Sequence, residues 1–131
     1  MNTQAMAQAV QFIPRTQAAV IRDLLNGEEN KYFVERFHAL AHTIETMPVT
    51  YEQDGKGDNA VAYLHYFTGS CDWWITEKDI DGGVKQAFGL VRLNGGDYEL
   101  GYISIEELTC IPLVEIDLHF NPTSIGEIKG A

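Results

Sequence analysis

Residues 86–103 decide the fold, and they read QAFGLVRLNGGDYELGYI. The run 94–97, Asn-Gly-Gly-Asp, separates two segments that are rich in aromatic and aliphatic residues. A turn of this composition between two apolar runs is a strong local indication of a β-hairpin. The stretch therefore predicts two antiparallel strands, over residues 86–93 and 98–103.

The chain on either side of this hairpin continues the strand pattern. Residues 71–77 predict another strand, in which Trp73 and Trp74 point to opposite faces of the sheet. Further strands are predicted over residues 49–53, 60–67 and 114–120. Because the predicted turns between successive strands are short, the sequence favours an antiparallel meander.

Residues 1–46 have a helical pattern instead. Two helices are predicted, over residues 16–26 and from about residue 30 to 47. In the second helix, Phe37, Leu40 and Ile44 recur at intervals of three and four and form one apolar face. Pro48 then ends the helix.

Two short helices are predicted near the C-terminus. They begin at Ser104 and Ser124, each of which has a Glu three residues later, as in a capping box. The predicted class is α+β: two N-terminal helices packed on a mainly antiparallel sheet of five to six strands. With 131 residues the chain fits one domain, with a helical front (1–46) and a strand-rich part (48–128).

The charge is concentrated in the second part. The chain has 9 Lys and Arg against 19 Asp and Glu, which gives a net charge of −10. Residues 1–46 contribute 4 basic and 5 acidic residues, and residues 47–131 contribute 5 basic and 14 acidic residues. This balance excludes nucleic-acid binding through a broad basic patch. No apolar run is long enough to span a membrane and no signal peptide is evident, so we expect a cytoplasmic protein.

The motifs that would mark an enzyme or a metal site are incomplete. The acidic run 77–82 begins like a calcium loop, but the position that needs a bidentate Glu is Phe88. His38 and His42 have helical metal-ligand spacing, but Ala39 stands where a zinc protease would have Glu. No phosphate-binding loop or nucleophile elbow is present. We therefore predict no metal and no cofactor, and an enzyme is the less favoured class.

Five stretches between residues 48 and 128 resemble a bacterial family known as domain of unknown function 2958. The matching residues are 67–68 with 72–77, then 88–91, 99–108, 115–122 and 124–128. The resemblance implies a protein of plasmids, integrative elements or phages, often encoded near antirestriction genes. It implies no activity.

Our first functional hypothesis is an interaction protein whose acidic surface engages a basic partner. Such a surface competes with DNA for a groove built for phosphates, so a nucleic-acid-handling or defence enzyme would fit. Anti-restriction or anti-CRISPR inhibition is one form of this hypothesis. The predicted contacts are Glu77, Asp79, Asp81, Asp97 and Glu99, with Trp74 and Tyr102 as aromatic anchors.

Two alternatives remain open at this point. The first is a small enzyme or ligand-binding domain, in which carboxylates surround an aromatic pocket. The carboxylates predicted for that pocket are Asp72, Glu77, Glu99 and Asp117. The second alternative is an accessory subunit that forms a homodimer through an open sheet face or an edge strand.

Overall fold

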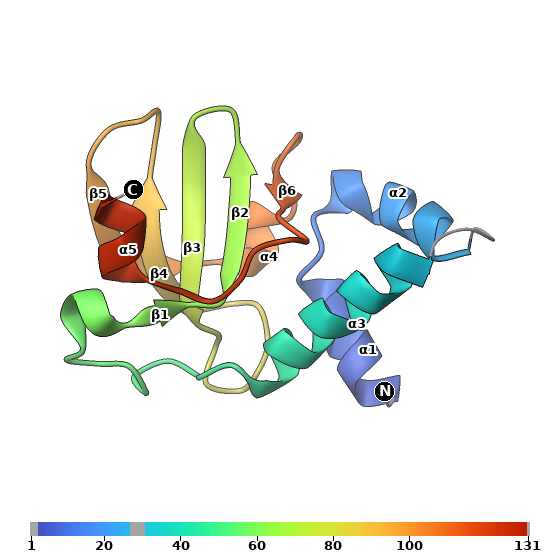
Figure 1. The fold of residues 1–131 in the computed structure, drawn as a ribbon, viewed down its shortest axis with the longest axis horizontal. Helices are drawn as coiled ribbons and strands as arrows, with labels where there is room; N and C mark the ends of the chain where they lie inside the picture. Colours follow the sequence, from blue (N-terminus) through green and yellow to red (C-terminus); the bar gives the residue numbers. More distant parts are fainter. Residues whose placement is uncertain (1–2, 27–30, 131) are drawn as a thin grey trace.

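The computed structural model describes residues 3–26 and 31–130, and its fold is α+β (Figure 1). Three helices lead the described chain: α1 (Thr3–Gln11), α2 (Arg15–Asn26) and α3 (Lys31–Thr46). The predicted helices correspond to α2 and α3. Helix α1 was not predicted, because its buried residues Ala5 and Ala9 stand between glutamines and give only a weak apolar pattern.

The main sheet has five antiparallel strands in the order β5-β4-β3-β2-β6. Their bounds are β2 (Leu64–Thr68), β3 (Cys71–Glu77), β4 (Ala87–Arg92), β5 (Tyr98–Ile103) and β6 (Glu115–Ile116). The predicted hairpin is confirmed as β4 and β5, and Asn94 and Gly95 in its turn have φ of 54° and 68°. The meander from β2 to β5 is also confirmed.

Three strand predictions need correction. Residues 49–53 form turns, with one isolated bridge between Val49 and Lys78. The segment 60–67 is divided, because β1 (Val61–Ala62) pairs with β7 (Thr123–Ser124) in a separate two-stranded sheet. In the segment 114–120 only β6 is a strand, and the carbonyl of Leu118 accepts two bonds from the Arg36 guanidinium instead of pairing in the sheet.

The two predicted serine caps are confirmed. Ser104 Oγ accepts the Glu107 N–H at 3.1 Å at the start of α4 (Ile105–Leu108). Ser124 Oγ accepts the Glu127 N–H at 3.2 Å at the start of α5 (Ile125–Gly130). A short 3₁₀ helix, η1 (Gly57–Asn59), completes the elements.

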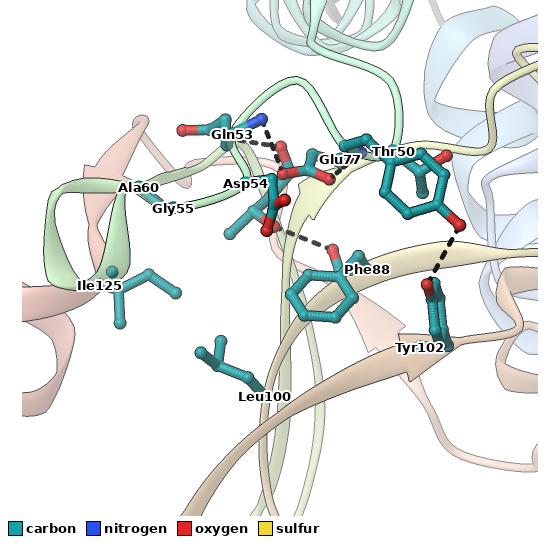
Figure 2. Close-up of a pocket in the computed structure, with 13 residues that line it drawn as sticks. Thr50, Gln53, Asp54, Gly55, Ala60, Glu77, Phe88, Leu100, Tyr102 and Ile125 are labelled. Atoms are coloured by element: carbon teal, nitrogen blue, oxygen red, sulfur yellow. Dashed lines mark hydrogen bonds between the residues drawn. The ribbon is translucent and has the colours of Figure 1, made fainter.

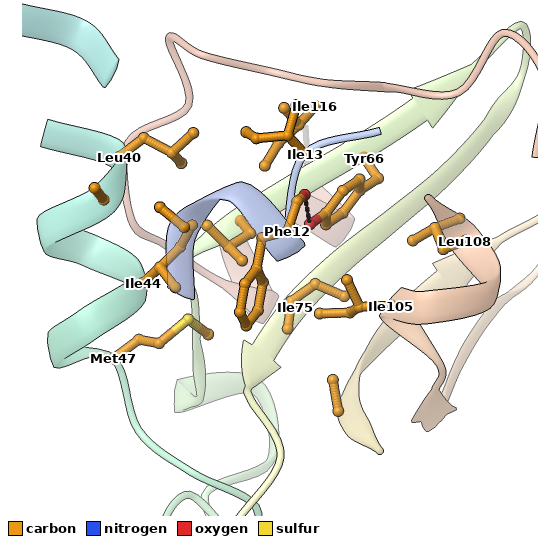
Figure 3. Packing of buried hydrophobic residues seen from close by; sticks show 14 of the residues in the cluster. Phe12, Ile13, Leu40, Ile44, Met47, Tyr66, Ile75, Ile105, Leu108 and Ile116 are labelled. Carbon is orange, nitrogen blue, oxygen red and sulfur yellow. Dashed lines mark hydrogen bonds between the residues drawn. The ribbon is translucent and has the colours of Figure 1, made fainter. Parts of the chain in front are cut away.

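One face of the sheet carries the larger core, and we call it the helix face. Phe12, Ile44, Tyr66 and Ile75 lie in its core, between the N-terminal helices and the strands (Figure 3). The Tyr66 hydroxyl donates to the Phe12 carbonyl within this core. Burial of this kind stabilises the fold by roughly 25 cal/mol per Å² of apolar surface.

The opposite face, which we call the α5 face, is covered less. A smaller core there joins Trp74, Leu90 and Ile125, with α5 and β1 over part of the sheet (Figure 1). Trp73 packs instead on the helix-face core, so the two tryptophans do point to opposite faces. In the described part of the chain, no helix is long and apolar enough to cross a membrane.

Candidate functional site

A β-bulge in β3 brings a glutamate onto the α5 face. The register passes from Ile75 opposite Gly89 to Glu77 opposite Phe88, so Thr76 is the extra residue. Without the bulge, Glu77 would alternate onto the helix face, like Ile75. Bulges re-aim side chains and are frequent beside functional sites. Here the result is a carboxylate beside the cross-strand pair of Phe88 and Tyr102.

Glu77 lines a pocket of about 190 Å³, which we call the Glu77 pocket (Figure 2). Its other walls come from the loop 50–57, from β4 and β5, and from the start of α5. The principal lining side chains are Tyr51, Asp54, Phe88, Leu100, Tyr102 and Ile125. The pocket thus combines aromatic and aliphatic walls with two carboxylates, a composition suited to small-ligand recognition.

Glu77 is the buried carboxylate of this pocket. Its residue is 4% exposed, and its two oxygens accept the backbone N–H groups of Tyr51 at 2.8 Å and Gln53 at 3.1 Å. Among the described residues, no cationic side chain lies within 4 Å of this carboxylate. Each carboxylate oxygen has two acceptor sites, so the group keeps capacity for a further donor.

The loop that donates to Glu77 is held in an unusual conformation. Tyr51 has φ of 79°, a left-handed geometry that costs a non-glycine residue about 1–2 kcal/mol. The Gln53 side chain fixes the loop by donating to the carbonyls of Val61 and Thr76, both at 2.8 Å, and by accepting the Val61 N–H at 2.7 Å. Strain of this kind persists where surrounding bonds over-determine the backbone, often at binding sites.

Two tyrosines form the rim of the pocket. The hydroxyls of Tyr51 and Tyr102 lie 3.2 Å apart, and both side chains are mainly exposed. The hydrogen bond to Tyr51 raises the pKa of the Tyr102 phenol, and the negative charges of Asp54 and Glu77 add to this effect. Tyr102 also meets Phe88 edge to face at 5.4 Å between ring centroids. The rim therefore presents two phenol hydroxyls and aromatic faces to solvent.

The four predicted pocket carboxylates do not converge. Glu77 alone reaches this pocket. Asp72 and Asp117 flank His65 instead, with Asp72 Oδ1 at 2.7 Å from Nε2 and Asp117 Oδ2 at 3.7 Å from Nδ1. Glu99 lines a separate pocket with Asp97, Val91 and Leu93.

The predicted partner contacts are also dispersed. Asp79 and Asp81 follow β3, and their carboxylates accept the N–H groups of Gln86 at 3.0 Å and Gly83 at 2.7 Å within their own loop. Asp97 and the start of β5 lie at the other end of the sheet, because Gly95 in that turn donates to Ser70, before β3 begins. These acidic side chains therefore form two groups at opposite ends of the sheet.

The two predicted aromatic anchors differ in exposure. Trp74 is 9% exposed because it stacks on His65 at 5.1 Å and packs in the smaller core. Tyr102 is 56% exposed. Of the two predicted anchors, only Tyr102 therefore lies on the surface.

Sequence reasoning did not anticipate Tyr51, Gln53 and Asp54 as site residues. Residues 49–53 alternate between apolar and polar side chains as a short strand does, so the sequence did not indicate a loop there. The Gly-rich run that starts at Asp54 did indicate a turn beside β3. Among the residues that the structure describes, no three His, Cys, Asp or Glu side chains are grouped so that they could hold a metal ion.

Comparison with known proteins identifies one family. No curated protein and no solved structure matches the chain. A family model described as "Protein of unknown function (DUF2958)" matches residues 33–125. The matched range includes every residue that lines the Glu77 pocket, from Thr50 to Ile125. The chain thus belongs to the DUF2958 family.

Proposed function

We propose that this protein is a non-enzymatic binding protein, and that its Glu77 pocket receives a cationic side chain of a basic protein partner. The single observation that carries the proposal is the Glu77 carboxylate itself. It is 4% exposed, has no cationic partner within 4 Å among the described residues, and lines a pocket open to solvent. A buried charge of this kind is stabilised most by an opposite charge that also donates hydrogen bonds.

The walls of the pocket favour a guanidinium or ammonium group over other donors. The rings of Phe88, Tyr51 and Tyr102 offer aromatic faces, which attract cations. Asp54 adds a second carboxylate at the mouth. The net charge of −9 over residues 47–131 attracts a basic partner and accelerates its encounter.

A small-molecule titration tests the pocket. Ethylguanidinium and butylammonium are added to ¹⁵N-labelled protein, and the amide signals of Tyr51 and Gln53 are followed, because these amides donate to Glu77. We expect saturable shifts at both amides. Hydrogen bonds to charged groups contribute about 1.5–3 kcal/mol, so Glu77→Gln should weaken the binding roughly 10- to 100-fold.

The matched control is Asp97→Asn, which removes one negative charge at a distance from the pocket. This variant should bind the probes as the wild type does. Equal weakening in both variants would show that net charge, and not the pocket, attracts the cation. A wild-type protein with no shift at Tyr51 or Gln53 would overturn the proposal.

The finer form of the proposal concerns the identity of the partner. We propose a cytoplasmic protein of a mobile genetic element, which inhibits a host nucleic-acid-handling or defence enzyme of the anti-restriction or anti-CRISPR target type. Glu52, Asp54 and Asp58 are exposed acidic residues on the 50–57 loop and on η1, and Asp54 lines the pocket. Their negative charges support competition with a phosphate backbone. A pull-down from host lysate at about 50 mM and about 200 mM salt should retain a basic enzyme only at low salt.

A further inference from the structure

We infer that the free edge of β5 accepts an extended segment of the basic partner as an additional antiparallel or parallel strand, which delivers a Lys or Arg side chain to the Glu77 pocket. The inference rests on the proposed function and names the form of the ligand. Three observations support it: the different hydrogen bonding at the two sheet edges, the β5 side chains that line the Glu77 pocket, and the negative charge of the chain.

The two edge strands of the main sheet differ in the hydrogen bonding of their outer backbone groups. At the β6 edge, the Gln17 side chain accepts the Ile116 N–H at 2.7 Å and donates to the Ile116 carbonyl at 3.1 Å. The side-chain amide thus satisfies the same groups that a neighbouring strand would. At the β5 edge, no backbone or side-chain group in the described part of the chain hydrogen-bonds to the outer side of the strand. Such an edge is a ready template for strand addition.

The pocket opens onto this same edge. Leu100 and Tyr102 alternate on β5 and both line the Glu77 pocket, and both are more than half exposed. In an added strand, every second side chain would lie on the same face of the sheet as Leu100 and Tyr102. One of those side chains would therefore point over Phe88, toward Asp54 and Glu77 (Figure 2).

The spacing selects a long side chain. An added strand would lie three strand intervals from β3, or about 14 Å. The Glu77 carboxylate is held by the backbone N–H groups of Tyr51 and Gln53. A side chain on the added strand would therefore have to extend across β5 and β4 to approach it, and Lys and Arg are the longest cationic side chains. A short polar side chain on the added strand would stop above Leu100.

Charge favours a basic segment over a second copy of this chain. Pairing of two β5 edges would bring together two chains that each carry −10, including the exposed Glu99 on β5 itself. Like charges on an edge strand are a common protection against self-pairing. The guanidinium of Arg92, the nearest cation on β4, is already bound to the carbonyls of Gly95 and Gly96.

The test uses a seven-residue peptide in which threonine and valine alternate around a central arginine. Amide hydrogen exchange of the full chain is measured by NMR with and without this peptide. We expect alternate amides within residues 98–103 to become protected. A peptide that is N-methylated at alternate residues cannot form the ladder, so it should bind at least tenfold more weakly. A peptide with central glutamate should also bind at least tenfold more weakly.

Three outcomes would overturn the inference. The first is equal affinity of the methylated and unmethylated peptides without protection of β5, while ethylguanidinium still shifts Tyr51 and Gln53. That result would support cation binding in the Glu77 pocket and would show that the peptide does not pair with β5. The second is equal binding of the glutamate peptide. The third is protection of β5 amides in the peptide-free protein together with a doubled mass in sedimentation equilibrium, which would identify a second copy as the occupant.

Discussion

The helix face and the α5 face of one sheet use buried polar groups in opposite ways. On the helix face, the Tyr66 hydroxyl is bonded to the Phe12 carbonyl, inside a continuous apolar core. On the α5 face, a smaller core leaves the Glu77 carboxylate lining a pocket open to solvent. The helix face thus supplies most of the stability. This stability permits the α5 face to keep the left-handed Tyr51 loop and the buried Glu77 charge.

Two neighbouring residues show the same difference. Lys78 is 5% exposed, and its ammonium donates to the carbonyls of Ile44 at 2.6 Å and Glu45 at 2.9 Å, near the end of α3. Burial lowers the pKa of this ammonium, and the charges of Glu45 and Glu52 oppose the shift. Lys78 is therefore bound within the fold. Glu77, one residue earlier, holds a loop and still has room for a ligand.

The largest expected effect is a difference in unfolding free energy between substitutions on the two faces. Ile75→Ala leaves a cavity in the helix-face core and should cost about 2–5 kcal/mol of unfolding free energy. Leu100→Ala removes a half-exposed side chain from the pocket rim and should cost less than about 1 kcal/mol. Urea unfolding followed by circular dichroism measures both. Equal losses would break the distinction between a structural and a binding face.

The second effect is a dependence on alkaline pH. Burial raises the pKa of the Tyr66 phenol well above its ordinary value of 10.0. The unfolded chain therefore loses this proton near pH 10 while the folded chain retains it, so stability is intact below pH 10 and falls above it. Tyr66→Phe should cost about 1–3 kcal/mol at neutral pH, because the Phe12 carbonyl loses its donor.

The same variant should flatten the alkaline loss of stability. Thermal melts from pH 8 to pH 11 compare Tyr66→Phe with the wild type. Parallel decline of the two proteins above pH 10 would assign the alkaline sensitivity to other groups.

The third effect concerns the β6 edge. Gln17→Ala removes both hydrogen bonds to Ile116. This substitution should cost about 1–2 kcal/mol of unfolding free energy, because one hydrogen bond contributes about 1 kcal/mol. Gln8→Ala, which removes one bond to Gly82, is the matched control and should cost less. If Gln17→Ala is as stable as the wild type, the Gln17 amide does not close this edge.

The smallest effect is expected at the rim. Tyr102→Phe removes the hydroxyl contact with Tyr51 and keeps the ring, so stability should change by less than about 0.5 kcal/mol. Ethylguanidinium binding should weaken by no more than a few-fold, because the aromatic face remains. Tyr102→Ala, which removes the face as well, should weaken it further. Equal binding by both variants would remove cation–aromatic attraction from the account.

Features that depend on neighbouring residues could be predicted from the sequence. The turn at 94–97 and the caps at Ser104 and Ser124 follow from local chemistry, and each is confirmed. The α+β class followed from the change from helical to alternating periodicity after Pro48. Helix α1 could not be predicted, because the small residues Ala5 and Ala9 are buried only through packing in the folded protein.

The site depends on features that no local pattern encodes. The bulge at Thr76 is a change of register between β3 and β4. It determines which face of the sheet the Glu77 side chain reaches. The left-handed Tyr51 is stabilised by hydrogen bonds from the Gln53 side chain to Val61 and Thr76, which lie 8 and 23 residues further along the chain. Glu77 was predicted as a pocket carboxylate, but its separation from Asp72 and Asp117 could be seen only in three dimensions.

The most direct test of the central claim follows the Glu77 carboxyl carbon. Protein labelled with ¹³C at glutamate carboxyls is titrated with ethylguanidinium, and the side-chain signals of Glu77 and Glu99 are assigned through the Glu77→Gln and Glu99→Gln variants. We expect a saturable shift of the Glu77 signal at concentrations that leave the exposed Glu99 signal unchanged. A Glu77 signal that stays fixed, or that moves only in parallel with Glu99, would contradict the assignment of this pocket as a cation site.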